Sequence, residues 1–455
     1  MAIATAMGRG GVGIVRVSGP NLKSFIMDFF GQALTPRHAH YLPFHDKNGI
    51  ALDYGIALYF VAPNAYTGED VLELQGHGGP AVLRLLLDRC LEVGRPYGMR
   101  LANAGEFTLR AFLNDKIDLA QAEAIADLIN ANSGAAAKAA AASLSGVFSE
   151  QINALTEELI TLRVLVEATL DFPEEEIDFI EKYEIRPRLL KVLTSLQETV
   201  QIARQSSFLN EGLKVVLAGE PNVGKSSLMN ALFHRDVAIV TDIPGTTRDA
   251  IRDTLDLDGV PITVADTAGL RDTSDQIEQM GIQRSLKEIT EADVILDVMD
   301  SRNPHSMLAT HEDIKNLEDK VVLRVYNKSD LVTPSDSSFK HSDDDHQTKQ
   351  PRDSISVSAK TGLGLDVLKQ AILSACGRTL GEASPWLGRK RHIEAMVIAI
   401  EHLEIANEYA QLDDSALDLL AEELRLSHDA LGEITGKMTS DDLLGRIFSS
   451  FCIGK

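Results

Sequence analysis

Cysteine, long apolar runs and basic residues are all scarce in this chain of 455 residues. Its three cysteines, Cys90, Cys376 and Cys452, lie far apart, which excludes a disulfide framework and the paired spacing of a zinc site. Free thiols are typical of a reducing compartment, so we expect a cytoplasmic protein. No apolar run approaches the roughly 20 residues of a membrane span, and the N-terminus lacks a signal-peptide pattern, so we expect no membrane segment.

Acidic residues outnumber basic ones by 67 to 44, which gives a formal net charge of −23. A protein that simply coats nucleic acid would be basic, so the charge argues against this class. A nucleic-acid substrate held at a local basic patch remains compatible with the charge, and residues 389–392 (RKRH) are the candidate patch. The alternative for these residues is the solvated start of a helix.

The pattern of apolar residues changes along the chain and predicts a multidomain α/β protein. Residues 1–115 contain short strand-like runs and a helical stretch, which predicts an α+β domain. Apolar residues at helical spacing dominate residues 116–210 and return in residues 377–455. Strand-like and helical runs alternate in residues 211–376, which lie between them. Because helices flank this segment on both sides, we predict that it is a separate domain inserted into one all-α domain.

Residues 219–226 (GEPNVGKS) match the pattern G-x-x-x-x-G-K-[ST]. A strand-like run precedes them and a helical run follows, which is the context that a phosphate-binding loop (P-loop) requires. The glycines allow backbone N–H groups to surround phosphate oxygens at the start of a helix. Lys225 is expected to reach the β- and γ-phosphates, and the Ser226 hydroxyl to bind Mg²⁺. The predicted nucleotide contacts of this loop are Asn222, Val223, Gly224, Lys225, Ser226 and Ser227.

Residues 266–269 (DTAG) end a second strand-like run, residues 262–265. The D-x-x-G pattern is common, but here it closes the appropriate strand. Asp266 is expected to hold Mg²⁺ through water, and the N–H of Gly269 is expected to contact the γ-phosphate. The predicted contacts of this motif are Asp266, Thr267, Ala268 and Gly269.

Residues 327–330 (NKSD) end another strand-like run and predict guanine as the base. The Asp330 carboxylate is expected to accept two hydrogen bonds from guanine, whereas adenine offers neither donor in that place. Residues 358–360 (SAK) would support the base from the other side. Four motifs in this order predict a GTPase whose doubly wound, Ras-like sheet binds the nucleotide at the carboxyl ends of its strands. The predicted contacts of the last two motifs are Asn327, Lys328, Ser329, Asp330, Ser358, Ala359 and Lys360.

The residue that orients the attacking water is not evident from these motifs. In Ras-like enzymes a glutamine follows D-x-x-G, but this chain has Leu270 there, which cannot orient water. Glu278, in the polar segment that follows, is one candidate; the alternative is a solvated carboxylate on a helix. Residues 241–249 (TDIPGTTRD) are a candidate switch loop, in which Thr246 or Thr247 would complete the coordination of Mg²⁺.

The source of positive charge at the γ-phosphate is also open. Arg248 and Arg252 are both ambiguous as arginine fingers. A monovalent cation is the alternative, because the Asn222 side chain and backbone carbonyls of residues 241–246 could form an oxygen cage for it.

Three short segments resemble known motifs without fitting them. Residues 8–13 (GRGGVG) match a dinucleotide fingerprint, but a strand-like run follows where a helix is required, so we expect a turn near a ligand. Residues 75–79 (QGHGG) are similar to a hydrolase oxyanion loop, but the chain has no G-x-S-x-G, so we expect a strand-to-helix turn. Residues 451–455 (FCIGK) are not a prenylation box. We expect a frayed tail there, with a reactive cysteine at Cys452 as the alternative.

Further segments identify a family. They are residues 8–16, 66–73, 75–79, 104–107, 111–116, 118–124, 245–249 and 452–455. On these residues, and over essentially its whole length, the chain resembles the tRNA-modifying GTPase family MnmE, also called TrmE. The resemblance implies an N-terminal domain that dimerises and binds 5-formyltetrahydrofolate or a related one-carbon folate.

The resemblance also implies a reaction and a partner. Members of the family act with the FAD- and NADH-using protein MnmG, in a heterotetramer that contains the MnmE homodimer. The two proteins add a carboxymethylaminomethyl or aminomethyl group to C5 of the wobble uridine of certain tRNAs. The G domains of the family pair across the nucleotide when K⁺ is bound.

The family's functional residues can be carried over to this sequence by position. The folate contacts fall on Arg16, Glu73, Lys116 and the terminal Lys455. The K⁺ ligands fall on Asn222, Thr241, Ile243 and Thr246, and the Mg²⁺ ligands fall on Ser226 and Thr247. The switch-loop contacts with the nucleotide and K⁺ are Thr241, Asp242, Ile243, Pro244, Gly245, Thr246 and Thr247. The water-orienting acid falls on Glu278, and Cys452 matches a family cysteine proposed to be catalytic.

Two other functions compete with tRNA modification. A ribosome-assembly GTPase would carry a basic RNA-binding appendage, such as a KH domain. The acidic composition and the helical C-terminal segment argue against that function. A folate-dependent one-carbon transferase with a purely regulatory G domain is the second alternative.

Overall fold

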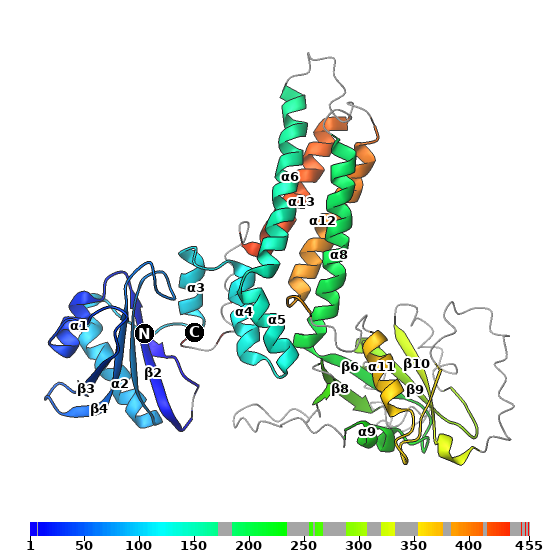
Figure 1. Ribbon diagram of the computed structural model, residues 1–455, viewed down its shortest axis with the longest axis horizontal. Helices are drawn as coiled ribbons and strands as arrows, with labels where there is room; N and C mark the ends of the chain where they lie inside the picture. Colours follow the sequence, from blue (N-terminus) through cyan, green and yellow to red (C-terminus); the bar gives the residue numbers. More distant parts are fainter. Residues whose placement is uncertain are drawn as a thin grey trace, which may run out of the picture. The chain divides into compact units, whose positions relative to one another are not determined.

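The computed structural model describes most of the chain. The described residues are 1–6, 8–171, 184–233, 254–257, 260–266, 288–306, 320–332, 354–375, 384–412, 416–436, 447, 451 and 454. They form two compact units, which we describe one at a time (Figure 1). The first unit comprises Met1–Ala126, Ser143–Leu196 and Ala395–Lys455. The second unit comprises Asp127–Ala142 and Gln197–Glu394.

The first unit begins with an antiparallel sheet of strand order β1-β2-β5-β4-β3. The strands are β1 (Ala2–Ile3), β2 (Gly10–Gly19), β3 (His40–His45), β4 (Ala51–Phe60) and β5 (Asp70–Gly78). Alternate residues of β2 and β5 are buried, so one face of the sheet is apolar. Helices α1 (Lys23–Phe30) and α2 (Pro80–Gly94) pack on that face, and the short helix η1 (Arg95–Tyr97) follows α2. The α+β architecture predicted for the N-terminal segment is therefore confirmed.

Helices make up the rest of the first unit. They include all or part of α3 (Glu106–Leu113), α4 (Leu119–Asn130), α6 (Val147–Asp171), α8 (Ile185–Glu211), α12 (Lys390–Tyr409) and α13 (Leu417–Thr435). Helix α6 packs along α13, although the two are far apart in sequence. His402 of α12 bonds Glu423 of α13 through Nδ1 and Oε2 at 2.6 Å, and Ser427 donates to the carbonyl of Ala399 at 3.1 Å. Segments from both flanks of the G domain thus form one helical bundle (Figure 1).

The second unit contains a sheet of strand order β11-β10-β9-β6-β8-β7. Its strands are β6 (Leu213–Ala218), β7 (Thr254–Leu257), β8 (Val260–Asp266), β9 (Val294–Asp300), β10 (Val321–Asn327) and β11 (Ser354–Ser356). All neighbouring pairs are parallel except β7 and β8. Apolar residues of α9 (Lys225–Phe233) and α11 (Leu365–Ala375) join one core with the central strands, and α5 (Gly134–Leu144) contributes alanines to it. This arrangement confirms the predicted doubly wound P-loop fold.

Within the described residues, no helix combines the length and the apolar character needed to cross a lipid bilayer. The acidic residues 172–183 and the polar residues 333–353 lie outside the described residues.

Candidate functional site

The P-loop connects β6 to α9, and its geometry requires two of its glycines. Gly219 has φ +149°, and a Cβ atom there would lie 2.2 Å from the carbonyl oxygen of Val298 in β9. Gly224 has φ +93°, and its Cβ would lie 2.4 Å from Nδ2 of Asn327. Real Cβ atoms do not approach so closely, so the pattern G-x-x-x-x-G follows from close packing as well as from left-handed backbone.

The Lys225 amine lies inside this loop, at the first residue of α9. Its Nζ donates to the carbonyl of Gly219 at 2.7 Å and to that of Glu220 at 3.2 Å, and the residue is 8% exposed. The start of α9 presents backbone N–H groups in the same place. A buried ammonium beside these donors can neutralise phosphate oxygens. Ser226 and Ser227 follow in the first turn of α9.

Asn327 connects the guanine motif to the P-loop. It ends β10 and is 1% exposed. Its Nδ2 donates to the carbonyl of Val223 at 3.0 Å, and its Oδ1 accepts the N–H of Ala359 at 3.1 Å. The predicted P-loop, NKSD and SAK motifs therefore meet around one buried amide, at the carboxyl ends of parallel strands.

Ser358 orients the Asp330 carboxylate that the sequence assigns to guanine. The serine hydroxyl donates to Oδ1 of Asp330 at 2.6 Å, and it accepts the N–H of Thr361 at 3.2 Å. Asp330 is exposed, so its carboxylate is accessible to a ligand. Lys360 follows in the same turn. The SAK motif thus bonds directly to the residue that is predicted to read the base.

Asp300 is a charged residue of this region that the sequence patterns did not reveal. It ends β9, between β6 and β10, and its Oδ2 accepts from Lys328 Nζ at 2.9 Å. Lys328 has left-handed φ (63°), and its Nζ also donates to the carbonyl of Asn222 at 2.6 Å. The sequence feature that could have indicated Asp300 is its position as a carboxylate at the end of an apolar strand, like Asp266 at the end of β8.

Several predicted residues lie outside the described part of the chain. They are Thr241, Asp242, Ile243, Pro244, Gly245, Thr246, Thr247, Thr267, Ala268, Gly269, Glu278, Cys452 and Lys455. The backbone of Asp266 ends β8, whose neighbour in the sheet is β6. The roles predicted for these residues stay predictions.

A second charged cluster lies on the face of the N-terminal sheet opposite α1 and α2. Arg16 of β2 and Glu73 of β5 are opposite one another in the sheet, and Arg16 Nε donates to Glu73 Oε1 at 2.9 Å. The guanidinium carbon of Arg16 lies 5.3 Å from the ring centre of Tyr66 and 5.6 Å from that of Phe107. Two aromatic rings and a carboxylate thus fix this arginine.

Lys116 is brought to the turn that carries Tyr66. Asn114 Nδ2 donates to the carbonyl of Thr67 at 2.7 Å. At Gly68, which has φ +78°, a Cβ would lie 3.1 Å from Lys116 Cγ. The structure therefore places two of the four predicted folate contacts, Arg16 and Lys116, beside the same turn, and a third, Glu73, pairs with Arg16.

The described residues at the C-terminus pack against the fold, contrary to the expected frayed tail. Phe451 is 7% exposed and packs against Leu119 and Ala122. Gly454 is buried with φ +101°, and a Cβ there would lie 2.1 Å from the carbonyl oxygen of Ile3. Ile3 belongs to β1, which pairs with the part of β2 that contains Arg16. The chain end is thus anchored beside the Arg16 strand.

The two glycine-rich segments near the N-terminus are structural. Strand β2 begins at Gly10, inside the first segment, and no helix follows the glycines directly, so the dinucleotide reading is rejected. The second segment ends β5 and supplies Gly79 as the N-cap of α2, which confirms the predicted strand-to-helix turn. A Cβ at Gly78 would lie 2.6 Å from the carbonyl oxygen of Gly10, so the two glycine segments pack on each other.

The candidate basic patch at residues 389–392 is the start of α12. Arg389 bonds the carboxylate of Asp127, with Nε 3.0 Å from Oδ2, and Asp127 is 6% exposed. His392 is 2% exposed. The predicted start of a helix is therefore confirmed, but it is only partly solvated, because His392 is buried and Arg389 bonds Asp127.

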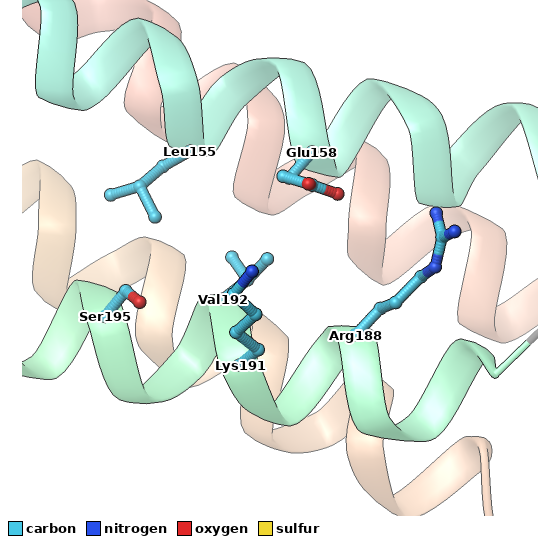
Figure 2. Close-up of a pocket in the computed structure, with 6 residues that line it drawn as sticks. All are labelled: Leu155, Glu158, Arg188, Lys191, Val192 and Ser195. Atoms are coloured by element: carbon cyan, nitrogen blue, oxygen red, sulfur yellow. The ribbon is translucent and has the colours of Figure 1, made fainter.

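A groove of about 250 Å³ lies between α6 and α8. It is lined by Leu155, Glu158, Arg188, Lys191, Val192 and Ser195. Figure 2 shows Arg188 extending from α8 toward α6, with the apolar side chains of Leu155 and Val192 facing one another farther along. None of the residues predicted from the sequence lines this groove, and its charges are of both signs.

Comparison with known proteins matches two family models to the chain. The model described as GTP-binding protein TrmE N-terminus matches residues 1–116, and the MnmE helical domain matches residues 119–452. A protein of Bordetella parapertussis named tRNA modification GTPase MnmE is 57% identical over 455 residues, covering 100% of this chain and 98% of its own. A protein of the same name from Cupriavidus metallidurans is 52% identical over 470 residues, with the same coverage.

Solved structures of GTP-binding proteins match part of the chain. Aquifex aeolicus Era is 27% identical, with a TM-score of 0.29, and covers 42% of this chain and 66% of its own. The G domain of the T. maritima FeoB iron transporter is 30% identical, with a TM-score of 0.27, and covers 36% of this chain and 98% of its own.

Proposed function

Because this chain belongs to the MnmE family of tRNA modification GTPases, we propose that it couples GTP hydrolysis to modification of the wobble uridine of certain tRNAs. The group added at C5 of the uridine is carboxymethylaminomethyl or aminomethyl. The observation that carries the GTP site is the Asn327 amide, which joins the P-loop at Val223 to the SAK loop at Ala359. A loop that binds phosphate and a carboxylate that reads guanine are thereby held in one unit.

In the proposed reaction, water attacks the γ-phosphate of GTP and yields GDP and phosphate. Lys225 neutralises charge on the β- and γ-phosphate oxygens, because its amine is already inside the P-loop. Ser226 and Thr247 would hold Mg²⁺, and Asp266 would contact it through water. The fit of Ser226 rests on its place in the first turn of α9, next to Lys225. Glu278, to which the family resemblance assigns this role, would orient the water, since Leu270 at the position of the Ras glutamine cannot.

K⁺ would occupy a cage made by Asn222, Thr241, Ile243 and Thr246. Asn222 fits this role in the described structure, because it has left-handed φ (66°) and an exposed side chain whose amide oxygen can bind a cation. Bound there, K⁺ supplies the positive charge that an arginine finger supplies in other GTPases. G domains of two protomers would pair across the nucleotide in this state.

The N-terminal cluster would bind a one-carbon folate such as 5-formyltetrahydrofolate. Glu73 offers a carboxylate to the N–H groups of the pterin ring, and Lys116 and Lys455 offer ammonium groups to the folate glutamate carboxylate. The support for this fit is that Arg16 and Lys116 lie beside one turn and that Glu73 pairs with Arg16. A homodimer joined to an MnmG-like FAD protein in a heterotetramer would use the folate and tRNA together, in the cytoplasm.

The K⁺ proposal predicts a cation-dependent rate. GTP turnover should be about tenfold or more faster in K⁺ than in Na⁺ at equal ionic strength, because only the larger ion fits a cage built for it. Steady-state phosphate release at saturating GTP measures the difference. The Asn222→Ala variant should turn over at the Na⁺ rate in both salts. Equal rates of the native protein in the two salts would contradict the cation cage.

The tRNA proposal is tested by nucleoside analysis. Deletion of this gene should remove the modified wobble uridine from total tRNA, and the native gene on a plasmid should restore it. Mass spectrometry of digested tRNA measures the nucleoside. Complete modification in the deletion strain would favour the ribosome-assembly GTPase or the folate-dependent transferase as the function.

A further inference from the structure

Asp300 occupies the position in the sheet at which the two nucleotide loops meet. Strand β9 lies between β6, which leads into the P-loop, and β10, which leads into NKSD. Asp300 is the last residue of β9 and is directly opposite Asn327, the last residue of β10. Its side chain is 15% exposed. A carboxylate at this position can therefore bond to groups of the P-loop or of the NKSD loop.

The Lys328 ammonium lies between Asp300 and the P-loop. Nζ is 2.9 Å from Oδ2 of Asp300 and 2.6 Å from the carbonyl oxygen of Asn222. Lys328 and Asn222 both have left-handed backbone, with φ of 63° and 66°. Non-glycine residues adopt this conformation at a cost, so the contacts around them must hold it in place. One ammonium therefore links two strained turns.

Asp300 stays ionised in this environment. Hydrogen bonds from Arg302 hold the pKa of Asp300 well below its usual range; burial opposes them, and the Lys328 ammonium adds to them. Arg302 Nη2 lies 2.6 Å from Asp300 Oδ2, but its side chain is 53% exposed. In the described structure Arg302 makes no bond to the P-loop. Among the described contacts of Asp300, Lys328 provides the link to that loop.

We propose that Asp300 is a positioning residue of the GTP site, which holds the Lys328 ammonium on the Asn222 carbonyl and so couples the guanine-reading loop to the P-loop. Without the carboxylate, the ammonium is free to leave the carbonyl for solvent, and the P-loop loses one of its attachments. The carbonyl belongs to the residue that would bind K⁺. The proposal rests on the GTP site proposed above.

Asp300→Asn tests this role, because the amide keeps the size of the side chain and removes its charge. The dissociation constant of GDP, measured by isothermal titration in K⁺ and Mg²⁺, should rise about tenfold. The value of kcat at saturating GTP should stay within about twofold, because the residue touches no reacting atom. Arg302→Gln is the matched control: it removes the other partner of Asp300 and should leave the dissociation constant within about twofold.

A double-mutant cycle separates positioning from general destabilisation. Lys328→Met should raise the dissociation constant of GDP at least as much as Asp300→Asn, and the double variant should be no worse than Lys328→Met alone. Additive losses, or an unchanged dissociation constant in Asp300→Asn, would overturn the proposal. If Asp300→Asn fails to fold, an unchanged dissociation constant in Lys328→Met overturns it equally.

The Lys225→Ala variant distinguishes failure of this inference from failure of the GTP site. If Lys225→Ala loses GDP binding while Asp300→Asn binds normally, the GTP site stands and the role of Asp300 fails. If Lys225→Ala itself binds GDP normally, the proposed GTP site fails, and the role of Asp300 fails with it.

Discussion

An Asp330→Asn variant is expected to lose affinity for GTP by about 10³-fold and to gain affinity for xanthosine triphosphate. In the proposed site the Asp330 carboxylate accepts hydrogen bonds from the N1–H and the amino group of guanine. Xanthine carries a carbonyl oxygen in place of that amino group. An asparagine amide donates to this oxygen while its own oxygen still accepts from N1–H. The diphosphates carry the same bases and should show the same changes, so titration with GDP and with xanthosine diphosphate measures both effects.

Ser358 is the structural reason to expect this exchange of bases. Its hydroxyl donates to Oδ1 of Asp330 at 2.6 Å, which favours an oxygen at that position. The asparagine would therefore keep its oxygen toward Ser358 and present its NH₂ group at the position of Oδ2. Ser358→Ala is the matched control, in which affinity for GTP should fall about tenfold with no gain for the xanthine nucleotide. Native affinity for GDP in Asp330→Asn would show that Asp330 does not read the base.

The nucleotide motifs could be predicted from the sequence because their chemistry resides in a few consecutive residues. Gly219, Gly224 and Lys225 lie within one strand–loop–helix unit, so the residue types imply the local geometry. The same holds for Asp330, which lies three residues after the end of β10, within the same short motif. The order of strand-like and helical runs likewise predicted the α+β domain and the doubly wound domain. Local backbone preferences and burial patterns were sufficient to predict these features from the sequence.

The contacts that the sequence did not predict join residues that are distant along the chain. Asp300 and Lys328 are 28 positions apart, and only the order β10-β9-β6 of the sheet brings their side chains to the P-loop. Gly454 fits against Ile3 because the last residues of the chain return to its first strand. No periodic pattern in the sequence indicates that Asp300 contacts Lys328 or that Gly454 contacts Ile3. Such contacts depend on the order of the strands and the path of the whole chain, which short sequence patterns do not reveal.

The P-loop is expected to tolerate no side chain at position 219. With φ of +149°, Gly219 already has a conformation that L-residues rarely adopt, and an added Cβ would lie 2.2 Å from the Val298 carbonyl oxygen. Val298 is 0% exposed and lies in the middle of β9, so its backbone has no room to withdraw. Gly219→Ala must therefore displace the loop itself. Because small misplacements of a binding group are costly, the affinity for GDP should fall by about 100-fold or more.

The Gly98→Ala variant is a control that separates the steric clash at position 219 from the free-energy cost of left-handed backbone. Gly98 also has positive φ (+67°), but nothing lies within 4 Å of the Cβ that it would gain. This control should lower the free energy of unfolding by about 1–2 kcal/mol and leave GDP affinity unchanged. Gly219→Ala should lower both the free energy of unfolding and the affinity for GDP, since the loop loses its contact with β9 along with its phosphate-binding shape. Titration with GDP and urea unfolding measure the two quantities, and native GDP affinity in Gly219→Ala would mean that the phosphates bind elsewhere.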